Sequence, residues 1–149
     1  MNQIRPWLYI GKYRETKDYP YLSRHNIGAM LLLAESVEQP GITSLYLPVE
    51  DGEPLPIDLL QEGLAFIHQQ HEQGKVVLVA CGAGISRSGS YAIAALKESE
   101  NLGLLDAFQE VQQRHPDTMP HYRLWQTLCE YYGEAIPWIE LHRHKTADD

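Results

Sequence analysis

The sequence is poor in cysteine and in positive charge, and both shortages exclude classes of protein. Its 149 residues include two cysteines, Cys81 and Cys129, too few for the multiple disulfides that hold small secreted domains together. Lysine and arginine total 12 against 20 acidic residues, a formal net charge of −8, whereas surfaces that bind nucleic acid or anionic membranes are normally basic. We therefore expect two free thiols, no nucleic-acid partner and no membrane partner.

Long apolar segments are also missing. No apolar run approaches the roughly 20 residues that a helix needs to cross a bilayer, and residues 1–6 do not have the apolar core of a signal peptide. There is no internal repeat, low-complexity segment or second-domain linker. This chain length and composition predict one compact domain, a cytoplasmic location and a monomer.

Clusters of metal-binding residues are absent from the sequence as well. His68 and His71 share one face of a predicted helix, but no third ligand is evident beside them. We expect a solvated helix face rather than a metal site, and no cofactor.

What is present is an alternation of short apolar runs with segments of helical periodicity. The predicted strands are Trp7 to Ile10, Ile27 to Leu33, Ile42 to Val49 and Val76 to Cys81. The predicted helices are Tyr19 to His25, Ile57 to Gly74, Ser88 to Ser99, Leu104 to Arg114 and Met119 to Tyr132. This alternation predicts an α/β fold, a three-layer sandwich whose central, mainly parallel sheet of four or five strands is flanked by helices. Residues 140–149 are polar and predict a frayed tail.

An apolar run that ends on a cysteine is the most informative feature. Residues 76–88 read Val-Val-Leu-Val-Ala-Cys-Gly-Ala-Gly-Ile-Ser-Arg-Ser, so Cys81 would lie at the carboxyl end of a strand and just before a helix. Ligands of open parallel sheets bind beyond this end of the strands, and a helix N-terminus favours an anion. The amides of residues 82–87 could form an anion-binding nest, with Gly82 and Gly84 easing the curvature.

Cys81 and Arg87 together indicate nucleophilic attack on a phosphate ester. Arg87 can hold two phosphate oxygens in a bidentate fork, and positive surroundings favour the thiolate of Cys81. The thiolate would form a phosphocysteine that water then hydrolyses, while Arg87 and the amides stabilise the equatorial oxygens. The Ser88 hydroxyl would ease departure of the sulfur. The expected substrate-binding residues are Gly82, Ala83, Gly84, Ile85, Ser86 and Arg87.

The spacing Cys-x-x-Gly-x-x-Arg is weak evidence when taken alone. In the alternative interpretation, Cys81 is an inert core cysteine at a strand end and Arg87 is a surface residue. The strand before the cysteine and the helix after it favour the phosphate site.

A general acid is expected in the loop of residues 49–54, Val-Glu-Asp-Gly-Glu-Pro. The loop follows a predicted strand, so it should open at the same edge of the sheet as Cys81 and could protonate the leaving oxygen. The candidates are Glu50, Asp51 and Glu53; Asp51 lies 30 residues before Cys81, a spacing that one helix and one strand can fill. The alternative is a solvated acidic turn without a catalytic role.

Residues 80–88, Ala-Cys-Gly-Ala-Gly-Ile-Ser-Arg-Ser, resemble the His-Cys-x-x-Gly-x-x-Arg-Ser/Thr motif of the protein tyrosine phosphatase superfamily, in its small dual-specificity branch. Residues 7–11, Trp-Leu-Tyr-Ile-Gly, are similar to the opening strand of that family. The order of the predicted elements through Tyr132 also fits. The resemblance covers most of the chain.

The resemblance implies a role for each matching residue. Cys81 would be the nucleophile, Arg87 the phosphate ligand and Ser88 the hydroxyl that assists the thiolate. Family members place the general acid, an Asp, in a loop before the helix that precedes the cysteine strand. Asp51 aligns best with it, Glu53 is the second choice and Glu50 the third. Residues 1–139 would form a catalytic domain similar to dual-specificity phosphatases, followed by the polar tail. The implied activity is that of a protein tyrosine or dual-specificity phosphatase.

One position departs from the family pattern. The residue before the cysteine is usually a histidine that helps to order the loop and to favour the thiolate, and here it is Ala80. The alternative function is therefore a phosphate-binding pseudophosphatase whose turnover is weak or lost.

The resemblance implies a phosphorylated protein or peptide as substrate, with phosphotyrosine first and phosphoserine or phosphothreonine as further candidates. The variable positions within residues 82–86 carry no basic side chain, whereas polyanionic substrates call for additional positive charge. A phosphate ester that is not a protein remains the alternative substrate. Residues 121–123, His-Tyr-Arg, fall near the rim of the family's active site, where substrate contact, a helix start and packing are all open.

Overall fold

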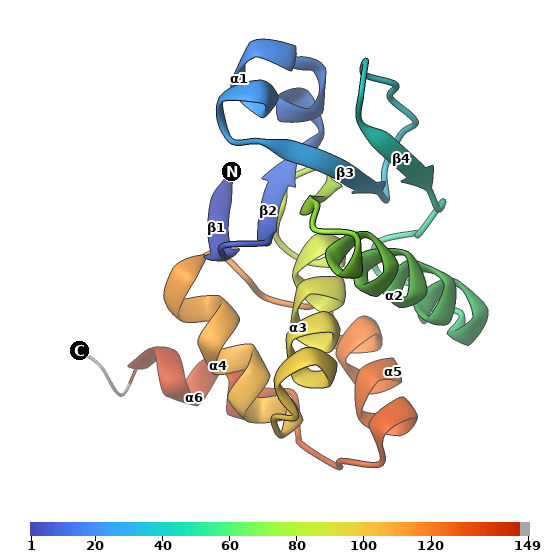
Figure 1. The fold of residues 1–149 in the computed structure, drawn as a ribbon. Helices are drawn as coiled ribbons and strands as arrows, with labels where there is room; N and C mark the ends of the chain where they lie inside the picture. The colour runs from blue at the N-terminus through green and yellow to red at the C-terminus, as the bar shows by residue number, and fades with distance from the viewer. Residues whose placement is uncertain (147–149) are drawn as a thin grey trace.

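A five-stranded sheet forms the centre of the computed structural model, which describes residues 1–146 (Figure 1). The strands run in the order β1 (Asn2–Arg5), β2 (Leu8–Lys12), β5 (Val76–Cys81), β3 (Ile27–Leu32) and β4 (Thr43–Tyr46). Strand β1 pairs antiparallel with β2, and every other neighbouring pair is parallel. The predicted fold class, a mainly parallel sheet within an α/β sandwich, is confirmed.

Strand β5 lies at the middle of the sheet because its side chains are apolar on both faces. Val77 and Val79 face one layer of helices, while Leu78 and Ala80 face the other, as the period of a strand requires. All four are at most 2% exposed. This central position brings Cys81, the last residue of β5, between the ends of β2 and β3.

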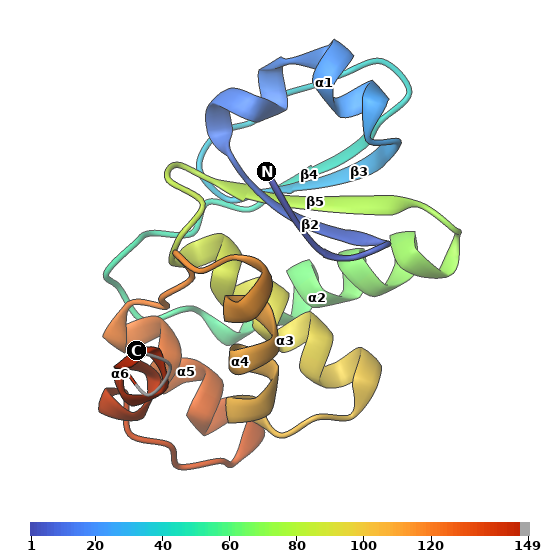
Figure 2. The same cartoon turned by 90° about the vertical axis from the view of Figure 1, so that its left-hand side faces the viewer.

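Helices cover both faces of the sheet (Figures 1 and 2). A 3₁₀ helix, η1 (Tyr13–Lys17), and helix α1 (Tyr19–Arg24) lie on one side. The helices of the other side are α2 (Ile57–Glu72), α3 (Arg87–Glu100), α4 (Leu104–Arg114), α5 (Tyr122–Tyr132) and α6 (Ile139–Thr146). The larger apolar core lies on this second side, so α3, which follows Cys81, is packed deep in the molecule. Among the described residues, the structure holds no helix long and apolar enough to cross a membrane.

Two predicted boundaries are wrong near the site. The strand predicted to reach Val49 ends at Tyr46, although the amides of Leu47 and Val49 still donate to carbonyl oxygens at the end of β3 and just beyond it. The helix predicted from Met119 begins at Tyr122, because Pro120 precedes the residue whose side chain caps the helix. Both differences lengthen the loops at the carboxyl edge of the sheet.

The end of the chain also differs from the prediction of a frayed tail over residues 140–149. Residues 139–146 form α6, and the Leu141 side chain is fully buried in the larger core. Leu141 thus packs this mostly polar helix against the larger core. Residues 147–149 lie outside the described residues, and the division of the chain at residue 139 stays a prediction.

Candidate active site

The loop between β5 and α3 brings a thiol and a hydroxyl together at the start of a helix. Cys81 ends the strand and is 2% exposed, while Ser88 lies in the first turn of α3 and is fully buried. Cys81 Sγ and Ser88 Oγ are hydrogen-bonded at 3.2 Å. The predicted pairing of a sulfur with a hydroxyl is therefore present in the geometry.

The Arg87 guanidinium lies over the beginning of this loop rather than in solvent. Its Nη1 donates to the Val49 carbonyl oxygen at 3.1 Å and approaches that of Leu33 at 3.5 Å. A Cβ built on Gly82 would lie 3.2 Å from Nη2 of Arg87. The interpretation of Arg87 as an ordinary surface residue is thus wrong, and glycine at position 82 leaves room for the guanidinium.

Gly84 gives the loop its sharp turn. Its φ of +71° lies in the left-handed region, which glycine enters without the steric cost that a Cβ brings. A Cβ at this position would also lie 3.0 Å from the carbonyl oxygen of Gly11, at the end of β2. A side chain at residue 84 is therefore excluded by its backbone angle and by its neighbour.

The carbonyl oxygens of residues 84–86 are all held by hydrogen bonds. His115 Nε2 contacts the first at 2.6 Å, the amide of Met119 donates to the second at 3.3 Å, and the amide of Ser90 donates to the third at 3.0 Å. In a trans peptide the N–H points away from the carbonyl of the preceding residue. The amides of residues 85–87 are therefore turned away from these three partners, as an anion-binding nest requires.

The acidic loop of residues 49–54 is held next to the loop between β5 and α3. Its Val49 carbonyl accepts from Arg87, as described, and a Cβ on Gly52 would lie 3.7 Å from His121 Nε2. The amide of Leu55, just after the loop, donates to Thr127 Oγ1 at 3.2 Å. Contacts from α3 and α5 thus hold the acidic loop at the rim of the site.

The choice of the acid within this loop stays a prediction. Glu50, Asp51 and Glu53 are all exposed, and Asp51 and Glu53 flank Gly52, whose φ is +85°. The loop is therefore in place, while the geometry does not separate the two carboxyl groups that flank the glycine.

Residues 121–123 connect the two loops. The amide of His121 donates to Ser86 Oγ at 2.8 Å, and His121 Nδ1 accepts from the amide of Arg123 at 3.2 Å as the cap of α5. Among the roles left open for these residues, the helix start is confirmed. Tyr122 is 52% exposed beside this junction.

Two residues at the site were missed by sequence reasoning, His115 and Met119. The contact between His115 and Gly84 spans 31 residues, and His115 follows the last residue of α4. Nothing in the sequence indicates that a histidine at the end of a helix contacts a loop so far away in the chain.

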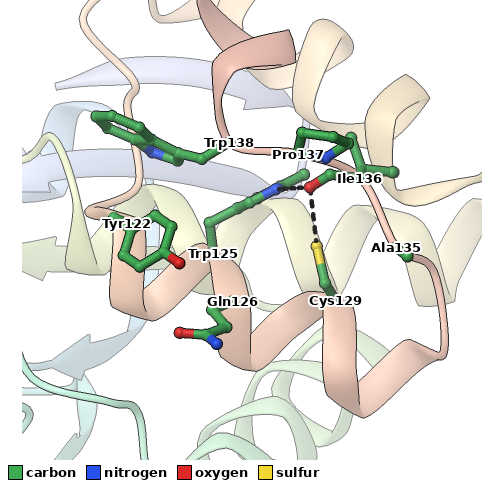
Figure 3. Close-up of a pocket in the computed structure, with 8 residues that line it drawn as sticks. All are labelled: Tyr122, Trp125, Gln126, Cys129, Ala135, Ile136, Pro137 and Trp138. Atoms are coloured by element: carbon green, nitrogen blue, oxygen red, sulfur yellow. Dashed lines mark hydrogen bonds between the residues drawn. The ribbon is translucent and has the colours of Figure 1, made fainter.

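The second cysteine has different surroundings (Figure 3). Cys129 Sγ lies 3.5 Å from the carbonyl oxygen of Ile136, and burial raises the pKa of the Cys129 thiol. It faces a hollow of about 290 Å³ between α5 and the segment before α6. The lining residues are Tyr122, Trp125, Gln126, Cys129, Ala135, Ile136, Pro137 and Trp138. Cys129 is therefore a free, half-buried thiol packed against this segment.

The histidine pair of α2 serves packing and hydrogen bonding. His68 Nε2 lies 2.9 Å from Glu98 Oε1, and His71 stacks on Trp7 with ring centroids 3.8 Å apart. In residues 1–146, no group of three or more histidine, cysteine or acidic residues is arranged to hold a metal ion.

Comparison with known proteins gives one consistent family. Residues 8–134 match the family model "Dual specificity phosphatase, catalytic domain". Dual specificity protein phosphatase 5 of Rattus norvegicus is 31% identical over 139 residues, which are 91% of this chain and 36% of the rat protein. Dual specificity protein phosphatase 22 of Homo sapiens is 29% identical over 155 residues, covering 91% of this chain and 83% of that protein.

Solved structures agree with the sequence comparison. The crystal structure of the human tyrosine phosphatase-like serine/threonine/tyrosine-interacting protein superposes with a TM-score of 0.82 at 28% identity, covering 89% of this chain and 95% of the human one. The chain spans about a third of the length of the rat relative, so similarity to that protein concerns one domain of it.

Proposed function

The chain belongs to the dual specificity phosphatase family, and we propose that it hydrolyses phosphate monoesters on proteins through a phosphocysteine intermediate. The observation that carries this proposal is the position of Cys81 Sγ, 3.2 Å from Ser88 Oγ. The sulfur lies at the start of a loop in which Gly82 packs against the Arg87 guanidinium. The residues from Cys81 to Arg87 form a Cys-x₅-Arg phosphate loop.

In the first step the Cys81 thiolate attacks phosphorus, a sulfur–phosphorus bond forms and the bond to the leaving oxygen breaks. Arg87 and the inward-facing amides stabilise the charge on the three equatorial oxygens. The Asp51 carboxyl gives its proton to the leaving oxygen, which departs as an alcohol.

In the second step a water molecule attacks the phosphocysteine. Asp51, now a carboxylate, takes a proton from the water, the sulfur–phosphorus bond breaks and inorganic phosphate is released. The leaving thiolate accepts a hydrogen bond from the Ser88 hydroxyl, which lies within reach of the sulfur. Loss of turnover without loss of binding is not favoured as an alternative, because a protein that only binds phosphate needs neither the thiol nor this hydroxyl.

The substrate class follows from the exposed part of the loop. Gly82, Ala83 and Ile85 are exposed and uncharged, and the net charge of the chain is −8. Exposed loop positions without a basic side chain suit a single phosphate on an aromatic side chain better than a polyanion. We propose phosphotyrosine in a protein or peptide as the first substrate, with phosphothreonine and phosphoserine next.

A thiolate nucleophile also restricts the cellular compartment in which the protein can be active. A thiolate stays available only in a reducing compartment, so a cytoplasmic location fits this chemistry. Every proposed catalytic group comes from one chain, which fits a monomer.

Measured release of inorganic phosphate from a set of substrates tests the proposed function. Because the chemistry uses no metal ion, we expect phosphate release to continue in the presence of EDTA. The rate with a phosphotyrosine peptide should be at least about tenfold above that with a phosphothreonine peptide or a phosphoinositide. Release only from the phosphoinositide would contradict the substrate class. Loss of all activity on addition of EDTA would contradict the mechanism.

A further inference from the structure

The phosphate loop is ordered in this chain without a histidine before the cysteine. Ala80 is 2% exposed in a buried apolar cluster with Leu22, Met30 and Leu32, on the face of the sheet covered by α1. Its methyl group offers no hydrogen bond to the loop. The oxygen atoms of the loop must therefore be held by other groups.

His115, at the end of α4, supplies such a group with its imidazole. It caps the C-terminus of α4, is 7% exposed, and brings Nε2 to 2.6 Å from the Gly84 carbonyl oxygen. Its own backbone is fixed on both sides, since its amide donates to Val111 at 2.8 Å and its carbonyl accepts from Thr118 at 2.9 Å. The imidazole is thus held rigidly against the loop.

The contact determines which ring nitrogen donates. A carbonyl oxygen only accepts hydrogen bonds, so Nε2 of His115 must carry a proton. Nδ1 is buried and has no hydrogen-bond partner among residues 1–146. A buried nitrogen without a hydrogen-bond partner costs stability, so the ring is not placed here for stability alone.

Gly84 is the position where the loop most needs an external contact. Glycine populates positive and negative φ about equally, so the peptide between residues 84 and 85 can turn over without a steric barrier from a side chain. If it turned over, the carbonyl of Gly84 would face the bound anion and the amide of Ile85 would face away. The bond from His115 opposes this rotation.

We infer that His115 is a positioning residue of the phosphate loop: its Nε2–H fixes the Gly84 carbonyl so that the amide of Ile85 faces the phosphate oxygens. The inference rests on the proposed function. It assigns to the end of α4 the loop-ordering role that the residue before Cys81 cannot fill in this chain.

Two substitutions at one position separate hydrogen bonding from packing. His115→Gln retains an N–H donor near the position of Nε2, whereas His115→Phe retains a planar ring and loses the donor. His71→Phe, which can keep the stack on Trp7, is the matched control far from the loop. The measurements are kcat/KM for para-nitrophenyl phosphate and the inhibition constant of orthovanadate, well below each variant's melting temperature.

We expect His115→Phe to lower kcat/KM about tenfold and to raise the inhibition constant of orthovanadate by a similar factor. His115→Gln should stay within about threefold of the parent in both values. His71→Phe should leave both values unchanged. If His115→Phe lowers only the melting temperature, or if His115→Gln loses as much as His115→Phe, the positioning role is wrong.

Vanadate binding separates this inference from the proposed function. A parent protein that binds vanadate and turns over no phosphate ester overturns the proposed function, while weaker vanadate binding by His115→Phe would still support the positioning role. Imidazole ¹⁵N NMR of the unaltered protein needs no variant to fold. It should show a proton on Nε2 of His115, and a neutral ring protonated on Nδ1 alone would overturn the inference.

Discussion

Replacing Cys81 by serine is expected to lower hydrolysis of para-nitrophenyl phosphate by roughly 10⁴-fold or more. A serine hydroxyl remains protonated near neutral pH and is a far weaker nucleophile than a thiolate. The sulfur is hydrogen-bonded to the Ser88 hydroxyl, which is itself too weak a base to activate another hydroxyl. The oxygen is slightly smaller than sulfur, so the loop and its affinity for phosphate should be retained.

The second cysteine provides a matched control for this substitution. Cys129→Ser changes the same atoms in α5, where Cys129 contacts the carbonyl of Ile136, and should keep kcat within about twofold of the parent. Steady-state kinetics with EDTA present, together with calorimetric titration of orthovanadate, give the comparison. Equal losses in the two variants, or substantial turnover by Cys81→Ser, would contradict the assigned nucleophile.

Replacing Asp51 by asparagine is expected to reduce kcat for phosphotyrosine peptides by about 10²–10³-fold, within the usual contribution of a general acid. The amide cannot give a proton to the leaving oxygen, and an alkyl or unactivated aryl oxygen needs one. Para-nitrophenolate leaves readily as an anion, so the loss on that substrate should be clearly smaller. Phosphate binding should not change, because the side chain is exposed at the rim and lies outside the loop that holds the oxyanion.

Glu53→Gln is the comparison that makes the Asp51 result decisive. The two carboxyl groups flank Gly52, and both are exposed, so each substitution removes one negative charge from the same turn. A series of aryl phosphates with leaving groups of increasing basicity measures the dependence on protonation. If the rate of Glu53→Gln depends more steeply on leaving-group basicity than that of the parent, and the rate of Asp51→Asn depends on it as the parent does, the role of acid passes to Glu53.

The sequence predicted the part of the site that is local in the chain. An apolar strand, a cysteine, two glycines and an arginine occur within residues 76–88, and their order alone positions a thiol at the N-terminus of a helix. Glycine was predicted to ease the curvature, and the positive φ of Gly84 shows the conformation that this requires.

The contacts that fix the loop from outside could not be predicted in the same way. Arg87 meets the carbonyl of Val49 across 38 residues, and His115 meets that of Gly84 across 31. Such contacts arise from the order of strands in the sheet and from the angle at which helices end, and neither leaves a periodic pattern in the sequence.

The elements that were missed have few apolar residues. Strand β1 buries one residue, Ile4, at the edge of the sheet, and α6 carries Leu141 as its fully buried contact among polar neighbours. Prediction from periodicity needs several buried positions at regular spacing. A single buried apolar residue in either element is too little to be recognised beforehand.

Trapping the covalent intermediate tests the central claim most directly. The protein is mixed with a ³²P-labelled phosphotyrosine peptide, quenched with acid within milliseconds, digested and examined by mass spectrometry. The account predicts one labelled peptide, phosphorylated on the sulfur of Cys81, which accumulates within a single turnover and disappears as phosphate is released. Turnover without any labelled protein, or a label on Cys129 or on a hydroxyl, would contradict it.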